Sequence, residues 1–477
     1  MAGSPNPAER NSRSNWSRRV TRTSNAPQPR CNQHMSTQTI QKSDFIEACI
    51  AAGGDAAPLP KLREEAAAAA RALGLPHTKL EEWRNTSVRV LSETEFDHRP
   101  SAAAPSGILR SLPMQDAEIR LVFVNGRLDE ALSSVPQDLS GAYVGLLRNA
   151  PESVQERLLS VYGTVADWRT LHFVALNTAC AAECAVLWVP ARAALARPVH
   201  IIHLGVSSGK PAASHPRLLC MLDEAAEATV VETFAVPGDQ VAFLNSVTEI
   251  KVAADARLFH SRLQLGSEKA LHISSLQANC ADRAKVEQTT FTYGGALVRN
   301  DTGSVLDGEA AETTLNALYI ARNEQHVDNH TTLDHAKPNC PSFEMYKGIV
   351  DDKASAVFRG RIIVRPDAQK TDSKQSNMNL ILSDDAVINS KPQLEIFADD
   401  VRCTHGATIG RIDDEPLFYL RSRGIDAKAA RHLLTFAFAS EVLDAIQPEQ
   451  LKNELEALIF ARFAAGDTLP SSDDLHS

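Results

Sequence analysis

The feature that most constrains this chain is an alternation of apolar and polar residues that begins near residue 117 and continues to about residue 420. Residues 118–124, 199–204 and 228–234 are clear examples. Successive side chains of a β-strand point to opposite faces, so the pattern predicts many short, half-buried strands. Turn signals separate them, whereas two-residue hairpin turns are mostly absent. A large sandwich and a solenoid of stacked strands both fit, and no strict repeat chooses between them.

Helical patterns flank this β region. Residues 61–73 are almost all strong helix formers and are followed by Gly74, a helix-stop residue. We therefore assign residues 36–115 to an N-terminal helical region with a linker, and residues 117–422 to the β core. Residues 424–466 form a C-terminal helical region with Asp426 as a helix N-cap. Its apolar face is wide enough either to pack on the chain's own core or to be shared with a partner.

The two ends of the chain have a different composition. Residues 1–34 contain six arginines and one glutamate and show no apolar periodicity. They predict a disordered basic extension, with an upstream start before Met35 or an organelle transit peptide as alternatives. Residues 467–477 predict a disordered tail. Scattered cysteines and the lack of a secretory signal indicate reduced thiols and a cytoplasmic location, or a plastid if residues 1–34 are a transit peptide.

Charge and motifs exclude several functions. The formal net charge of -10 disfavours nucleic-acid binding and binding to anionic membranes. No segment approaches the roughly 18 apolar residues of a spanning helix. No Walker A motif and no glycine-rich dinucleotide motif is present, so we expect no nucleotide to be bound by this chain.

Two groups of residues raise alternative functions. His326, Asp328 and His330 share one side of a strand and could hold zinc or iron, which suggests a stand-alone metalloprotein using the block 326–335. A polar, hydrogen-bonded strand face explains the same block. The aspartate doublets at 351–352, 384–385, 399–400 and 413–414 could serve a β-helical carbohydrate-active enzyme. Turn residues that bond nearby backbone amides explain them equally.

A third group, Cys403 and His405, also shares one strand face. A thiolate and an imidazole form half of an iron or zinc site, which another chain would have to complete. A buried cysteine beside a hydrogen-bonded histidine is the structural alternative.

The surroundings of Cys403 resemble a known family. Residues 391–410, KPQLEIFADDVRCTHGATIG, closely resemble the signature of the SufB/SufD family of iron–sulfur cluster assembly proteins, and residues 411–425 continue the likeness. The blocks 326–340, 348–350 and 358–360 and the segment from Leu75 to Trp83 also fit. The resemblance covers about residues 40–465.

The resemblance implies a fold and a function. The family has a right-handed parallel β-helix between N-terminal and C-terminal helical regions. Its SufD member is a non-catalytic scaffold that pairs with SufB through the β-helices, and a transient iron–sulfur cluster forms at their interface. The family's important histidine falls on His405, which becomes a candidate metal ligand shared with SufB, and Cys403 matches a cysteine near that interface. The C-terminal region is expected to bind the ATPase SufC through Arg421, Arg423, Gly424, Leu433, Phe436 and Phe438.

Two departures favour the SufD branch over the SufB branch. The SufB pattern carries a cysteine at about position 377 and a glutamate directly after the histidine. This chain has Asn377 and Gly406 there. The sulfur-accepting cysteine of SufB is therefore absent.

Overall fold

The computed structural model describes residues 44–53 and 59–465. The extensions predicted at residues 1–34 and 467–477 lie outside the described residues. No described helix is long and apolar enough to cross a membrane. The cysteines of the described part are all free thiols.

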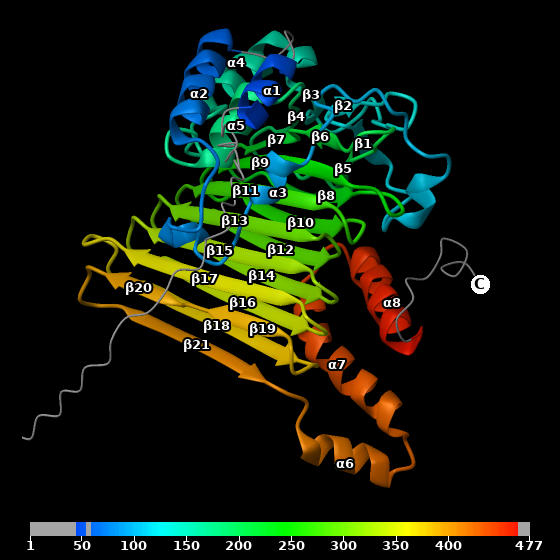
Figure 1. Cartoon of the computed structure of the whole chain (residues 1–477). Coiled ribbons are helices and arrows are strands. Elements are labelled where there is room, and N and C mark those ends of the chain that lie inside the picture. Colours follow the sequence, from blue (N-terminus) through cyan, green and yellow to red (C-terminus); the bar gives the residue numbers. More distant parts are fainter. Residues whose placement is uncertain (1–43, 54–58, 466–477) are drawn as a thin grey trace, which may run out of the picture. The chain divides into compact units, whose positions relative to one another are not determined.

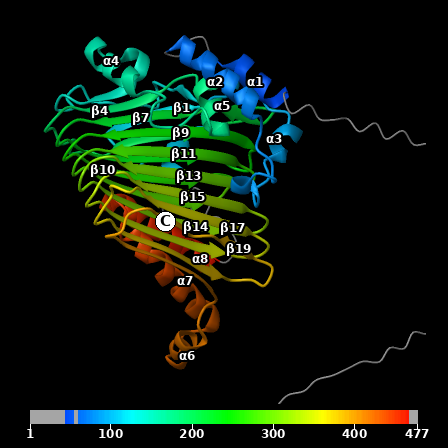
Figure 2. The same ribbon diagram turned by 90° about the vertical axis from the view of Figure 1, so that its left-hand side faces the viewer.

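The centre of the molecule is a parallel β-solenoid in which the chain alternates between two sheets (Figure 1). Arg257 pairs with Glu227, and Lys285 pairs with Arg257, so the chain returns to the same sheet after 30 and then 28 residues. Parallel neighbours need such long connections, which explains why two-residue hairpin turns are mostly absent. Figure 2 shows the turns stacked in chain order from β7 to β19. The predicted parallel β-helix between terminal helices is confirmed, and the sandwich is excluded.

We name the two sheets A and B. Sheet A contains, in spatial order, β19 (Val387–Ser390), β17 (Ser355–Val364), β15 (His326–His335), β13 (Leu297–Leu306), β11 (Leu271–Cys280), β9 (Ala242–Val252), β7 (Arg217–Leu222), β4 (Ala185–Val189) and β3 (Tyr143–Leu146), with β20 (Gln393–Ile396) beside β17 and β6 (Ala212–Ser214) beside β9. Sheet B contains β2 (Arg127–Leu128), β1 (Ile119–Val124), β5 (Val199–Leu204), β8 (Glu227–Ala235), β10 (Arg257–Leu265), β12 (Lys285–Tyr293), β14 (Glu312–Ala321), β16 (Pro341–Val350), β18 (Asp372–Ile381) and β21 (Arg402–Gly410).

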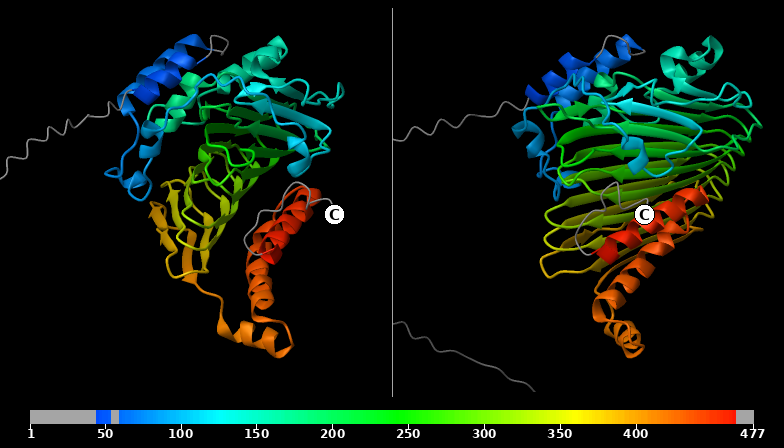
Figure 3. Two further views of the ribbon diagram at one scale, coloured as in Figure 1. Left: turned by 45° about the vertical axis from the view of Figure 1, so that its right-hand side comes forward. Right: turned by 90° about the vertical axis from the view of Figure 1, so that its right-hand side faces the viewer.

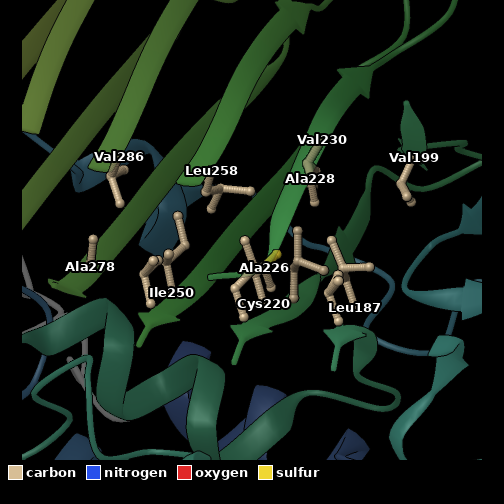
Figure 4. Packing of buried hydrophobic residues seen from close by; sticks show 14 of the residues in the cluster. Leu187, Val199, Cys220, Ala226, Ala228, Val230, Ile250, Leu258, Ala278 and Val286 are labelled. Atoms are coloured by element: carbon tan, nitrogen blue, oxygen red, sulfur yellow. The ribbon is translucent and has the colours of Figure 1, made fainter. Parts of the chain in front are cut away.

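Side chains that point between the sheets form the main core. Ala228, Leu258 and Val286 occupy matching positions on successive strands of sheet B, and Ile250 and Ala278 do so on sheet A (Figure 4). The five side chains are buried. Complete burial of one leucine, isoleucine or valine stabilises a protein by about 1.5–3 kcal/mol, so such rows hold successive turns together.

The N-terminal helices cover the outer face of sheet A. Phe243, Val247 and Ile273 of the sheet share a buried cluster with residues of α1, α2 and α5. As predicted, Gly74 stops α2: the helix ends at Leu73, and Gly74 follows as its C-cap with a φ of +66°, which suits glycine. The elements of this region are α1 (Asp44–Ala52), α2 (Pro60–Leu73), η1 (Glu81–Trp83), α3 (Arg89–Glu93), η2 (Ile108–Ser111), η3 (Leu147–Asn149), α4 (Glu152–Val161) and α5 (His172–Cys180).

The prediction assigned residues 117–422 to strands alone, but this range also contains the helices α4, α5 and α6. Residues 173–180 of α5 are all buried, so this helix shows no polar face that would reveal its period in the sequence. The last strand ends at Gly410 rather than near residue 422. Asp413 accepts a hydrogen bond from the Glu415 amide at 3.1 Å and so starts α6.

The C-terminal helices α6 (Asp414–Ser422), α7 (Ala427–Leu443) and α8 (Glu449–Ala465) follow the last strand. Asp426 caps α7 as predicted, because its carboxylate accepts from the amides of Lys428 and Ala429 at 2.9 and 3.1 Å. Buried residues of α7 and α8, such as Val442 and Leu455, pack on the outer face of sheet B (Figure 3). The apolar face of these helices is therefore used, at least in part, by the chain's own core.

Candidate functional site: the end of the solenoid at β21

His405 lies on β21, the last strand of sheet B. It pairs in register with Gln375 of β18, and no other described strand pairs with the second edge of β21. The His405 side chain is exposed, and no described residue forms a hydrogen bond with its ring. The ring is exposed because β21 is the last strand of the stack, so no further described strand covers this side of His405.

Cys403 occupies the same face of β21, as the sequence predicts. It pairs with Ser373, and the side chains of Ser373 and Ser342 are hydrogen-bonded at 2.7 Å inside the solenoid. Cys403 is half-buried against the apolar cluster of the last turns. Burial raises the pKa of its thiol, so the free side chain is protonated at neutral pH. A bound metal ion would have to displace that proton.

A column of polar side chains runs from His405 into the solenoid. Gln375 follows His405, and Glu344 of β16 follows Gln375 at the same register position. Gln375 Nε2 donates to Glu344 Oε2 at 2.7 Å. Thr331 of sheet A donates to Glu344 Oε1 at 2.6 Å, which shows that this column faces the interior. Burial raises the pKa of Glu344 to about 7, although the two hydrogen bonds act in the opposite direction.

Asn377 belongs to a second interior polar group. Its amide contacts the Tyr319 hydroxyl at 3.2 Å, and its carbonyl oxygen accepts from Asn379 at 2.7 Å and from Ser390 at 2.8 Å. The residue at this position is thus buried and held by both sheets. Sequence reasoning missed the glutamine–glutamate column, and it did not predict the hydrogen bonds around Asn377. The only signal was strand parity, since Gln375 and Asn377 lie one solenoid turn and Glu344 two turns before β21.

Apolar side chains surround the open end. Val387, Ile396, Phe397 and Ile409 are exposed by 51%, 40%, 63% and 49%. Val387 belongs to β19, Ile396 to β20 and Ile409 to β21, and Phe397 directly follows β20. Together with the unpaired edge of β21 they form what we call the β21 end. An exposed strand edge bordered by apolar side chains is a common docking surface for another chain.

The block 326–335 forms a different kind of group. His326, Asp328 and His330 do share one face, but this face points out of the solenoid toward the N-terminal segment. Thr86 bonds His326 Nε2 at 2.9 Å and Asp328 Oδ2 at 2.5 Å, and Arg299 donates to Asp328 at 2.7 Å. Burial opposes ionisation of Asp328, but Arg299, His330 and Thr86 hold the pKa of this carboxyl well below its usual range. These contacts tie the N-terminal segment to sheet A.

The described residues provide no group of three or more His, Cys, Asp or Glu that could hold a metal ion. The metalloprotein alternative therefore has no complete ligand set among them. The aspartate doublets at 351–352, 384–385 and 399–400 lie in the connections between strands, and the doublet at 413–414 lies at the start of α6. Asp352, for example, accepts from the Asn323 amide at 3.0 Å, and Asp413 caps α6.

The predicted partner-binding residues of the C-terminal region fall into two groups. Leu433 and Phe436 line a pocket of about 380 Å³ together with Phe460. Leu433 and Phe460 are 41% and 54% exposed. Phe438 instead lies beneath Lys347 of sheet B, whose ammonium is 4.5 Å from the centre of the ring.

Arg421, Arg423 and Gly424 lie at the end of α6 and are exposed. Arg423 stacks over Tyr419 at 5.1 Å and donates to its hydroxyl at 3.1 Å. Gly424 has a φ of +88°, which lets the chain leave α6 and enter α7.

Comparison with known proteins extends over most of the chain. The family model described as "SUF system FeS cluster assembly, SufBD core domain" matches residues 204–438, and that of the "SufBD protein N-terminal region" matches residues 47–201. The iron–sulfur cluster assembly protein SufD of Escherichia coli is 35% identical over 398 residues, which cover 82% of this chain and 90% of the relative. A SufBD family protein of Synechocystis is 33% identical, with coverage of 87% and 94%. The chloroplastic protein ABCI7 of Arabidopsis thaliana is 28% identical, with coverage of 87% and 88%.

Proposed function

Because the chain belongs to the SufBD family of iron–sulfur cluster assembly proteins, we propose that it is the SufD-type scaffold subunit of the SUF system. It pairs with SufB through the β21 end, binds the ATPase SufC through its C-terminal helices, and neither catalyses a reaction nor binds a nucleotide itself. The nascent cluster is its cargo and forms at the interface with SufB. The observation that carries the proposal is an exposed imidazole, His405, on the unpaired last strand of the solenoid.

The β21 end supports pairing with a second β-solenoid. Its free edge offers backbone N–H and C=O groups over residues 402–410, and the apolar rim offers surface to bury. A strand of SufB added beside β21 would satisfy these backbone groups, as in other cases of β-strand addition. It would also bring SufB side chains beside His405.

The chemistry of His405 and Cys403 supports a shared site. Imidazole nitrogen and thiolate sulfur are both ligands of iron in clusters. Two such groups are too few for a cluster, so the remaining ligands come from SufB. The exposed ring of His405 is free to bind, whereas the half-buried Cys403 must first lose its proton.

The apolar pocket of Leu433, Phe436 and Phe460 supports the binding of SufC. Phe418 and Tyr419 on α6 are also 72% and 56% exposed. Together with the side chains of the pocket they expose more apolar surface than a helix that faces only water needs. We assign the complex to the cytoplasm, with a plastid as the alternative if residues 1–34 are a transit peptide.

The test is to co-express the chain with SufB and SufC and to measure iron and sulfide in the complex purified without oxygen. His405→Ala should leave complex formation intact and reduce the cluster content to background. Thr404→Ala is the matched control, because Thr404 is exposed on the opposite face of the same strand. A full cluster yield with His405→Ala refutes the proposed role of His405. Failure of the wild-type chain to bind SufB and SufC refutes the scaffold assignment.

A further inference from the structure

Gln375 has an unusual hydrogen-bonding state. Its side chain is 3% exposed, and its Oε1 is buried without any hydrogen-bond partner. A buried acceptor without a partner costs about 1–3 kcal/mol, so its persistence needs an explanation. His405 is the next residue of the same interior column, one strand closer to the open end.

The other half of the Gln375 amide is firmly held. Its Nε2 donates to Glu344 at 2.7 Å, and Glu344 is in turn held by Thr331 at 2.6 Å. Gly360, on the facing strand β17, leaves room for the amide, because a Cβ at this glycine would lie 2.2 Å from Gln375 Nε2. Three residues from three neighbouring strands thus fix where the free oxygen of Gln375 can lie.

Strands of a sheet are about 4.8 Å apart, so the side chains of Gln375 and His405 are direct neighbours. A histidine that binds a metal with one ring nitrogen almost always donates the N–H of its other nitrogen to an oxygen acceptor. We propose that Gln375 is a positioning residue for His405: when the His405 ring turns toward the interior, its N–H donates to the free Oε1 of Gln375, which fixes the tautomer and leaves the other nitrogen for iron. The binding of iron by His405 rests on the proposed function, whereas the hydrogen bond between Gln375 and His405 does not.

The geometry is tested in the isolated full-length chain. Long-range ¹H–¹⁵N NMR of protein labelled with ¹⁵N-histidine distinguishes the two ring tautomers at pH 8, where an ordinary imidazole is neutral. The His405 signals are assigned by their loss in His405→Gln. We expect one tautomer in the wild type, a mixture of both in Gln375→Met and in Gln375→Asn, and a single tautomer again in Gln375→Glu, which keeps an acceptor oxygen. Lys374→Met, on the outer face of the same strand, is the control and should resemble the wild type.

The purpose is tested in the complex with SufB and SufC. Gln375→Met should lower the affinity for ferrous iron by about 10- to 100-fold, whereas Lys374→Met should not. A mixture of tautomers in the wild type, or the same single tautomer in the Met and Asn variants, overturns the inference. These outcomes leave the proposed function intact, because the scaffold assignment fails only if the wild-type chain does not bind SufB and SufC, and the role of His405 fails only if His405→Ala still assembles clusters. Circular dichroism and SufB binding verify that each variant is folded. If Gln375→Met does not fold, Gln375→Asn takes its place in both tests.

Discussion

Glu344 gives the sharpest test of the interior of the solenoid, because its carboxyl group is buried without a cationic partner. Burial raises its pKa from an ordinary 4.5 to about 7. The folded state therefore holds the proton more tightly than the unfolded state does. The stability that this carboxyl contributes is fully present below about pH 4.5 and is lost as the pH rises through 7. A shift of this size corresponds to a loss of about 3 kcal/mol at pH 8.5, at about 1.4 kcal/mol per pH unit.

Glu344→Gln should remove this pH dependence. A glutamine resembles the protonated carboxyl group in size. Its single oxygen can accept from Gln375 Nε2, and its NH2 group can donate to the Thr331 hydroxyl, which is both a donor and an acceptor. We expect the variant to differ from the wild type by less than about 1 kcal/mol at pH 5, and to be more stable by about 3 kcal/mol at pH 8.5. Urea unfolding at both pH values, followed by circular dichroism, measures the two differences.

Glu324→Gln is the control, because Glu324 is an exposed turn residue. It should have the same small effect at both pH values. The reasoning is refuted if Glu344→Gln changes the free energy of unfolding equally at pH 5 and pH 8.5. It is also refuted if the variant is less stable than the wild type at pH 8.5, since Glu344 would then be a stabilising anion.

Two further predictions concern the outer faces. Leu433→Asp places a charge in the apolar pocket of α7 and should abolish binding of SufC in a pull-down while SufB is still bound, whereas Asn453→Asp, exposed on α8, should have no effect. Thr86→Val removes the hydroxyl that bonds His326 and Asp328, and should lower the free energy of unfolding by about 1–3 kcal/mol and speed proteolysis near residues 75–90. Thr78→Val, at an exposed position of the same segment, should do neither, and equal proteolysis of the two variants would contradict the proposed anchoring role of Thr86.

Local features of the fold could be predicted because they depend on neighbouring residues. Strand parity correctly placed Cys403 and His405 on one face, and Asp426 and Gly74 correctly marked helix ends. The fully buried helix α5 was missed because it has no polar face. The choice between sandwich and solenoid was also out of reach of periodicity, since it depends on which strands pair.

The candidate site was only half predictable for a related reason. His405 was found from its motif, but its structural neighbours are Gln375 and Glu344, which lie one and two solenoid turns earlier. The turn lengths vary, and no repeat in the sequence reveals the register. The hydrogen bonds that Thr86 and Arg299 both donate to Asp328 could not be predicted either, because these three residues are distant in the sequence.

The composition of the interior columns is itself an argument for function at the β21 end. One column of sheet B begins with Ala228, Leu258 and Val286 and continues with residues that are polar or carry a thiol: Thr313, Ser342, Ser373 and Cys403. Apolar residues throughout would stabilise the solenoid more, because every buried polar group must find a partner.

The change to polar side chains lies in the turns that lead to Cys403 and His405, where the hydroxyl groups pair with one another: Thr313 with Ser304 at 2.8 Å and Ser342 with Ser373 at 2.7 Å. Departures from the most stable choice concentrate at functional sites. We therefore expect substitutions of Ser342 or Ser373 by alanine to be tolerated by the fold more readily than by cluster assembly.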